Sequence, residues 1–166
     1  MKPLEIEVQK TTKQFLDNYS KHDLAGIVVR ELLKSKGFIV IPYGEDRRFE
    51  RIWEAGEDRP NALIWKKGAQ LIFIDWKGHE TRKWILNERA YNSYVDYGAE
   101  FNLPVFCIWL VIPERKLFYA RLPFRSPKQE FMPHDQNYVI EASDWEIRDI
   151  DNLFDELGLE KQGRLT

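Results

Sequence analysis

Asp75 and Lys77 are the residues of this sequence whose types and spacing best suit chemistry. They follow the apolar run 71–74, which predicts a buried strand. Because side chains alternate along a strand, the Asp75 carboxylate and the Lys77 ammonium project to the same face. An acid can hold a divalent cation while a neighbouring lysine orients or polarises a water, so the pair suits metal-assisted phosphate chemistry. The alternative interpretation is a solvated ion pair at the end of a strand.

A second apolar run, residues 62–65, lies just upstream, and the polar turn 66–70 joins the two runs. Short runs rich in branched and aromatic residues, joined through a glycine, predict a β-hairpin of two largely buried strands. Pro60 and Asn61 lead into the first strand, and Gly78 directly follows Lys77. A proline, a polar residue, two strands and an acid-x-Lys-Gly group therefore form one continuous pattern.

This pattern resembles the PD-(D/E)XK, or restriction-endonuclease-like, nuclease superfamily, through Pro60-Asn61 and Asp75-Trp76-Lys77-Gly78. The likeness spans roughly residues 23–111. One position departs from the superfamily pattern, because an acid is expected where this chain has Asn61. A neutral amide can ligate a hard cation through its oxygen but contributes no charge. The resemblance implies an α/β fold with a restriction-endonuclease-like core, in which helices flank a mixed central sheet.

The resemblance also implies roles for individual residues. Asp75 and the backbone carbonyl of Trp76 would hold Mg²⁺ (or Mn²⁺), and Lys77 would position the attacking water. Asn61 would be a weakened ligand or a hydrogen-bond donor to the phosphate. Many members of the superfamily carry an auxiliary metal-binding Glu on the first core helix, and Glu31 matches that placement. A rim acid paired with Arg30 or Lys34 is the other interpretation of Glu31.

Two helices are expected before the first strand. Residues 5–19 have a weak helical stripe, and Ser20 or Asp23 offers a cap for a second helix that ends at Gly37. The apolar stripe of the second helix predicts its buried face, and Glu31 falls on or beside it. A carboxylate that points inward needs a partner or a cation. The residues of this stripe are Leu24, Ile27, Val28 and Leu32.

The remaining elements follow from apolar runs and breakers. Strands are expected at residues 38–41, 105–112, 117–120 and 138–140, and helices at about 83–101 and 149–157, with residues 123–133 irregular. The strands at 71–74 and 105–112 should be parallel neighbours linked by a crossover helix. The charged segment 43–59 either lies over a substrate, with its arginines on phosphates, or is a solvated loop.

A group of polar residues after the acid-x-Lys motif is expected to contact nucleic acid. Arg82, Lys83 and Arg89 cluster in sequence around the candidate site and would neutralise phosphates. Asn87 and Tyr91 lie one turn apart on the predicted helix. Their spacing resembles the Gln-x-x-x-Tyr pair that some superfamily exonucleases place beside the active site. Packing of Tyr91 in the core is the alternative.

Composition bounds the functional class. With 166 residues, 43% of them hydrophobic, one domain over 1–166 is expected, with a C-terminal extension at about 113–166. The net charge of −2 gives no overall basic field, although residues 113–128 are basic and 141–160 acidic. The one cysteine, Cys107, lies in an apolar run and predicts a buried thiol. The absence of a signal peptide and of a membrane span predicts a cytoplasmic, reducing location.

Three functions remain open on the sequence alone. The first is a divalent-metal-dependent endonuclease that hydrolyses phosphodiester bonds in DNA or RNA, with homodimers common in the superfamily; Asp75 and Lys77 favour it. The second is a catalytically disabled nuclease-fold module that binds nucleic acid or a protein partner, which Asn61 favours. A purely structural α/β partner protein is the third.

Overall fold

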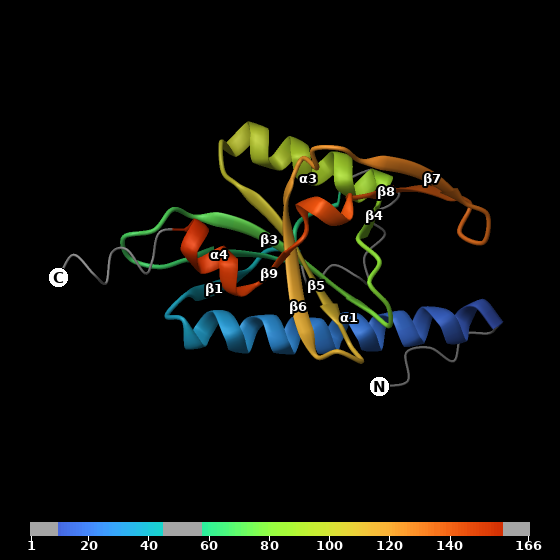
Figure 1. Cartoon of the computed structure of the whole chain (residues 1–166), viewed down its shortest axis with the longest axis horizontal. Helices are drawn as coiled ribbons and strands as arrows, with labels where there is room; N and C mark the ends of the chain where they lie inside the picture. Colours follow the sequence, from blue (N-terminus) through green and yellow to red (C-terminus); the bar gives the residue numbers. More distant parts are fainter. Residues whose placement is uncertain (1–9, 45–57, 158–166) are drawn as a thin grey trace.

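The computed structural model describes residues 10–44 and 58–157 of the chain. A six-stranded sheet lies at its centre, with one long helix across one face and a second helix over the other (Figure 1). The described helices are α1 (Lys10–Ser35), α3 (Glu88–Phe101), the single-turn η2 (Asp144–Glu146) and α4 (Asp151–Glu156). The described strands are β1 (Ile39–Pro42), β2 (Ala62–Trp65), β3 (Ile72–His79), β4 (Ile85–Asn87), β5 (Val105–Val111), β6 (Lys116–Leu122), β7 (Lys128–Met132), β8 (Asn137–Glu141) and β9 (Arg148–Asp149).

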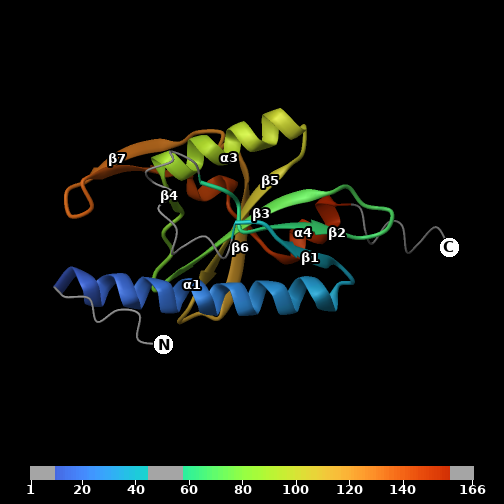
Figure 2. The ribbon, with the colours of Figure 1, turned by 180° about the vertical axis from the view of Figure 1, so that it is seen from behind.

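The central sheet is mixed, as predicted. Its order is β1-β2-β3-β5-β6-β9; β3 and β5 are parallel, and every other neighbouring pair is antiparallel. The predicted hairpin is present as β2 and β3, and the parallel pair is connected through α3. A second sheet, β4-β8-β7, lies beside the N-terminal end of α3, and its β7–β8 hairpin extends past that end (Figure 2).

Alternation along β3 sends its side chains into two separate cores. Ile72, Ile74 and Trp76 pack with α1 and α4 on one face of the sheet. Phe73 packs on the other face with α3 and the small sheet. Asp75 and Lys77 share the face of Phe73, because side chains two residues apart in a strand point the same way.

Strand β5 occupies the middle of the sheet and is buried along its whole length. An unbroken apolar strand is the pattern expected for a strand that is covered on both faces. Cys107 on this strand is free and buried, as predicted. Burial raises the pKa of the Cys107 thiol well above its usual value, so the neutral thiol behaves as a small apolar side chain.

The N-terminal part of the chain corrects two predictions. One helix, α1, runs from Lys10 to Ser35, so Ser20 and Asp23 lie inside it rather than at a break. Its buried face is formed by Ala25, Val29 and Leu33, at intervals of four residues. Leu24 and Ile27 of the predicted stripe are instead 41% and 49% exposed. The apolar pattern did not reveal these small residues, because they serve to let α1 approach β3 closely. A Cβ at Gly26 would lie 2.9 Å from Trp76 Nε1.

Other boundaries also differ from the predictions. Helix α3 begins at Glu88, because the preceding residues of the expected helix form β4 with β8. Residues 128–132, expected to be irregular, form β7. Most of the charged segment 43–59, namely residues 45–57, lies outside the described residues, so neither of its two interpretations is tested. In the parts of the chain that the structure describes, no helix is long and apolar enough to cross a membrane.

Candidate active site

The candidate site lies where β3 extends beyond its neighbour β2. The register between these strands ends at Ala62 and Ile74, whereas β5 pairs with β3 as far as His79. Among the described strands, β3 therefore has a partner on one side only from Asp75 onward. Backbone groups that lose a strand partner in a buried place need another partner. On this open side of β3, backbone groups without a strand partner lie next to the Asp75–Lys77 pair.

Asn61 supplies that partner. The Trp76 backbone N–H donates a hydrogen bond to Asn61 Oδ1 at 2.9 Å, and Asn61 is only 6% exposed. Because the N–H needs an acceptor, this contact fixes which end of the Asn61 amide carries the oxygen. The Nδ2 end lies 3.4 Å from Nε2 of His22 on α1. Asn61 therefore takes the place of a missing β2 backbone group beside the acid-x-Lys motif.

Asp75 is buried, with 1% of its surface exposed. Its Oδ1 accepts a hydrogen bond from the Tyr94 hydroxyl on α3 at 3.0 Å. The Lys77 Nζ atom lies 3.3 Å from Oδ2. This contact is an ion pair without hydrogen-bond geometry, and Oδ2 has no hydrogen-bond partner among the described residues. One carboxylate oxygen is thus anchored by Tyr94, and the other is paired with the Lys77 ammonium at 3.3 Å without accepting a well-aligned hydrogen bond from it.

The electrostatics of this pair follow from burial and mutual attraction. Burial raises the pKa of Asp75, opposed by Lys77 and by the hydrogen bond from Tyr94. Burial alone lowers the pKa of Lys77, but Asp75 together with Cys107 and Asp58 outweighs burial, and the pKa of Lys77 ends above its usual value. The side chain of Lys77 is 31% exposed, so its charge is reachable from outside. The site therefore holds a buried acid beside a protonated lysine. A bound cation would offset the cost of burying the negative charge of the acid.

A second buried acid, Asp58, faces the same site. Its carboxylate pairs with Nε of Arg89 at 2.7 Å, and its backbone carbonyl accepts a hydrogen bond from the Ser93 hydroxyl. The pKa of Tyr94 is raised mainly by burial and by the charge of Asp75, and the charge of Asp58 raises it further. Asp58 precedes Asn61 by three residues. From the sequence, Glu57 and Asp58 could substitute for the acid missing at position 61 only if this segment folds back. No spacing predicts the placement of Asp58, because it depends on α3 and the segment before β2 meeting in space.

The end of β3 is held close to α1. A Cβ atom at Gly78 would overlap the backbone carbonyl oxygen of Lys21, so only glycine leaves room for the helix there. Next to it, burial and the charges of Lys77, Lys21 and Lys83 lower the pKa of His79 from 6.5 to about 4. Lys83 therefore lies close enough to act on the end of β3. His79 is a neutral imidazole in a basic environment.

Glu31 corrects a predicted site residue. It lies two residues beyond Val29, about 200° around the helix from the buried face, and it is exposed. Helix α1 also packs on the sheet face opposite to Asp75. The prediction failed because the stripe was assigned to Leu24 and Ile27, which the fold leaves exposed. Glu31 is therefore not a ligand beside Asp75.

The expected nucleic-acid contacts are also distributed differently. Arg82 forms a two-point ion pair with Glu114, at 2.6 and 2.8 Å. Asn87 caps α3 by accepting a hydrogen bond from the Arg89 N–H, and the Tyr91 hydroxyl accepts one from the Phe124 N–H. Neither side chain lies against Asp75; Tyr94, one turn further along α3, does so instead. The expected pair pointed to the wrong tyrosine, because Tyr91 was selected by its spacing from Asn87, whereas Tyr94 donates to Asp75.

The donors near Asp75 are few for a divalent cation. Among the side chains that the structure describes, within residues 21–44 and 58–157, no three of His, Cys, Asp or Glu converge on one point. Mg²⁺, however, keeps several waters and commonly uses only one or two carboxylates. The buried Asp75 Oδ2, which lacks a hydrogen donor, fits such a ligand. The residues present are therefore suited to a weakly ligated hard cation.

Comparison with known proteins supplies the fold. No family model and no curated protein matches the sequence. Among solved structures, the chain is similar to Hjc, a Holliday junction resolvase from the archaeal hyperthermophile Archaeoglobus fulgidus. The TM-score is 0.50 and the identity 15%, and the match covers 73% of this chain and 84% of the resolvase. The fold is restriction-endonuclease-like. The fold class implied by the motif is thereby confirmed, and the restriction-endonuclease-like core carries Asp75 and Lys77 on adjacent positions of one face of β3.

Proposed function

We propose that this protein is a divalent-metal-dependent nuclease that hydrolyses phosphodiester bonds in DNA. The observation that carries the proposal is the Asp75 Oδ2 atom, which is buried, lacks a hydrogen-bond donor among the described residues and lies 3.3 Å from Lys77 Nζ. An anionic oxygen in that position is suited to a cation. The restriction-endonuclease-like fold, shared with a Holliday junction resolvase, supports the reaction class.

Asp75 Oδ2 and the backbone carbonyl of Trp76 would hold Mg²⁺ (or Mn²⁺), with waters completing the shell. When bound, the cation would lower the pKa of a water and stabilise negative charge on the phosphate. Tyr94 fixes the orientation of Asp75, and Asn61 fixes the β3 backbone at Trp76. Asp58 is the nearest additional acid, and it becomes available when Arg89 leaves it for a phosphate.

Lys77 has the most direct role among the residues of the chain. Its pKa lies above its usual value, because Asp75, Cys107 and Asp58 together outweigh burial, so its ammonium group stays protonated at neutral pH. A protonated lysine donates hydrogen bonds to an attacking water or to a phosphate oxygen as negative charge develops there. Its partial exposure leaves it reachable by a substrate.

DNA is the proposed substrate, with RNA as an outcome of the test. Arg89, which pairs with Asp58, and Lys83, whose charge acts on His79 at the end of β3, would contact the phosphates on either side of the scissile bond. Arg82 contributes less, because Glu114 already neutralises it. A homodimer that presents two such sites and a cytoplasmic location belong to the same proposal.

A second candidate function is a nuclease-fold module that binds nucleic acid without cleaving it. Asn61 favours it, because its oxygen already accepts the Trp76 N–H and its amide adds no negative charge. The Asp58–Arg89 pair favours it as well, since it neutralises the nearest other acid.

A cleavage assay separates these functions. The full chain is incubated with labelled duplex, single-stranded and four-way-junction DNA and with RNA, in Mg²⁺, Mn²⁺ or EDTA. Metal-dependent cleavage that Asp75→Ala and Lys77→Ala abolish, and that the exposed control Asp96→Ala retains, supports the enzyme. An inert parent whose Asn61→Asp variant gains cleavage supports a disabled enzyme. Cleavage that survives Asp75→Ala would contradict the assigned site.

A further inference from the structure

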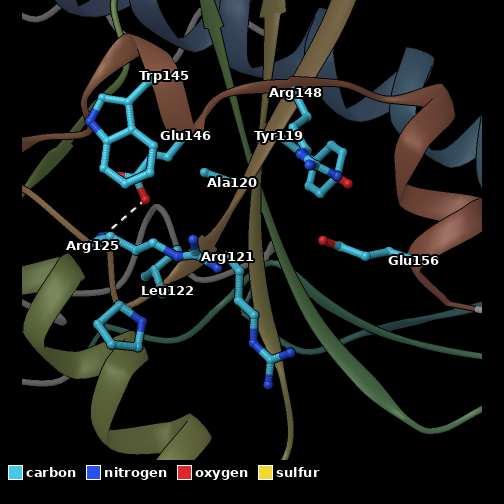
Figure 3. A pocket seen from close by; sticks show the side chains of 10 residues that line it. Tyr119, Ala120, Arg121, Leu122, Arg125, Trp145, Glu146, Arg148 and Glu156 are labelled. Carbon is cyan, nitrogen blue, oxygen red and sulfur yellow. Dashed lines mark hydrogen bonds between the residues drawn. The ribbon is translucent and has the colours of Figure 1, made fainter.

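A pocket opens at the β6 edge of the central sheet, away from the candidate active site. Strand β9 pairs only with Phe118 and Tyr119 of β6, so residues 120–122 have no strand partner on that side. A cavity of about 410 Å³ lies there (Figure 3). We call it the β6-edge pocket; its principal lining residues are Tyr119, Arg121, Arg125, Trp145, Glu146 and Arg148.

The β6-edge pocket and the acid-x-Lys pair lie on one row of the sheet. Asp75 pairs with Cys107 on β5, and Cys107 pairs with Ala120, which lines the pocket. Two strand spacings separate their Cα atoms by about 10 Å. Cys107 and Ala120 between them are buried, so a polynucleotide bound at Asp75 would reach the pocket around the covered core and not along this row.

Three arginines line the pocket together with two acids, Glu146 and Glu156, so the lining keeps a net positive charge. Among the described residues, the ion pairs do not involve Arg121, Arg125 or Arg148. The Oε2 atom of Glu146 is already engaged, because it accepts the backbone N–H of Arg125 at 3.0 Å. Guanidinium groups present forked donors that match the oxygens of a phosphate. Three such groups around one cavity favour an anionic ligand.

Two buried polar atoms of the pocket residues are without a hydrogen-bond partner in the described part of the chain. These are the Oε1 atom of Glu146 and the Tyr119 hydroxyl, although Glu156 and Arg148 lie close enough to that hydroxyl to act on its pKa. Tyr119 is 1% exposed, and burial together with Glu156 raises its pKa to about 12, so it remains a hydroxyl that can donate and accept. Oε1 of Glu146 accepts only. A hydroxyl and a carboxylate oxygen are suited to the polar edge of a nucleobase.

Trp145 adds a flat apolar surface at the rim. It lies on η2 and is 62% exposed, the largest value among the exposed large hydrophobic residues that the structure describes. Figure 3 shows Trp145 and Arg125 on one side of the pocket and Tyr119 and Arg148 on the other. Exposed aromatic rings beside cationic grooves stack unpaired bases, whereas a base inside a duplex has no free face to offer.

We propose that the β6-edge pocket binds an unpaired nucleotide segment of the DNA substrate, with a base on Trp145 and the flanking phosphates on the three arginines. The proposal rests on the nuclease function and adds to it a preference for substrates that contain a single-stranded or branched portion. An acidic peptide would use the arginines but would leave the ring and the two unpartnered polar atoms without a role.

The test uses the full chain in EDTA, where binding is measured without cleavage. Fluorescence anisotropy follows a labelled oligothymidylate and a blunt duplex of the same length. Trp145→Ala should weaken oligothymidylate binding about 5- to 150-fold, and Trp145→Phe should restore most of it. Trp65→Ala is the matched control, because Trp65 is 40% exposed at the other side of the sheet, on β2. Blunt-duplex binding should change little with any tryptophan variant.

The arginines are tested by salt dependence. Replacing Arg121, Arg125 and Arg148 together by Gln should reduce the slope of log affinity against log salt concentration by about 2, since each phosphate contact with a single strand contributes about 0.7. Lys116→Gln, at the other end of β6, is the charge control. Melting temperatures of all variants are compared with the parent, and the single variant Arg125→Gln replaces the triple variant if the latter unfolds.

Failure of this proposal is distinguishable from failure of the nuclease function. If Trp145→Ala and the arginine variants bind oligothymidylate as the parent does, the β6-edge pocket inference is overturned, whatever the activity. Poly-glutamate, measured in the same way, serves as the probe for an acidic protein ligand. If the pocket variants lose poly-glutamate binding but bind oligothymidylate as the parent does, the inference is overturned and the ligand is a protein. If the parent chain does not cleave DNA but Trp145→Ala and the arginine variants bind oligothymidylate more weakly than the parent, the nucleotide-binding pocket stands and the nuclease function is refuted.

Discussion

The side-chain oxygen of Asn61 accepts the backbone N–H of Trp76 at 2.9 Å, at the point where β2 no longer runs beside β3. A side chain therefore continues the hydrogen bonding of the sheet for one more residue. The same contact holds the backbone between Asp75 and Lys77. Asn61, at the position of the superfamily's first acid, thus acts on the site by positioning its backbone.

Asn61→Ala should lower the free energy of unfolding by about 1–3 kcal/mol, because it leaves the buried Trp76 N–H without an acceptor. Denaturant unfolding measures the change. Asn92→Ala, an exposed asparagine on α3, is the control and should stay within about 0.5 kcal/mol of the parent. Asn61→Asp keeps an acceptor oxygen and should be markedly more stable than Asn61→Ala; equal losses in the two variants would argue against the backbone role.

Asp75→Asn should abolish cleavage without reducing stability. Burial raises the pKa of Asp75, so above that pKa its ionised form costs stability that a neutral amide does not. The amide oxygen still accepts from Tyr94, and the partly exposed Lys77 can turn to water. In the absence of metal, we expect a rise in melting temperature of about 2–4 °C for each kcal/mol gained. A strongly lowered melting temperature would show that the ion pair stabilises the fold.

His79 should make stability depend on pH. Its folded pKa of about 4 lies below the unfolded value of 6.5, so the unfolded chain binds more protons between these values. Stability is therefore fully present above pH 6.5 and is lost as pH falls toward 4, by at most about 3 kcal/mol. Unfolding measured across this range should be steeper for the parent than for His79→Gln. Parallel curves would contradict the buried neutral state of His79.

Gly78→Ala should destabilise the protein by about 1–3 kcal/mol, because the added methyl group displaces either α1 or the end of β3. The Lys21 carbonyl oxygen that it meets is backbone and cannot rotate away. Lys77 is the adjacent residue, so cleavage should fall together with stability. A variant with parental melting temperature and activity would show that α1 does not press on β3 in solution.

The parts of the site that could be predicted from sequence are those fixed by local periodicity. Alternation along β3 places Asp75 and Lys77 on one face, and the apolar runs on either side of Gly68 predict the hairpin that carries them. The contacts made by Tyr94, Asp58 and His22 were not predictable. Each depends on elements far apart in the chain meeting at the open side of β3, and no spacing in the sequence encodes that meeting.

The error at Glu31 has a different physical origin. Hydrophobicity favours Leu24 and Ile27 as the buried face of α1, yet Ala25, Gly26 and Val29 face the sheet. Trp76 fills the interface with one large ring, so the helix contributes small residues there and leaves larger ones exposed. The size of a partner side chain across an interface cannot be deduced from the helix alone.

Binding of Mn²⁺ to the full chain, followed by electron paramagnetic resonance of the free ion, tests the central claim most directly. The parent should bind Mn²⁺ and Asp75→Asn should not, whereas Asp96→Asn, an exposed acid on α3, should bind as the parent does. The Asp75 Oδ2 atom predicts this outcome, because it is the buried oxygen left without a donor beside Lys77. Equal binding by the parent and Asp75→Asn, or no binding by either, would contradict a cation site at Asp75.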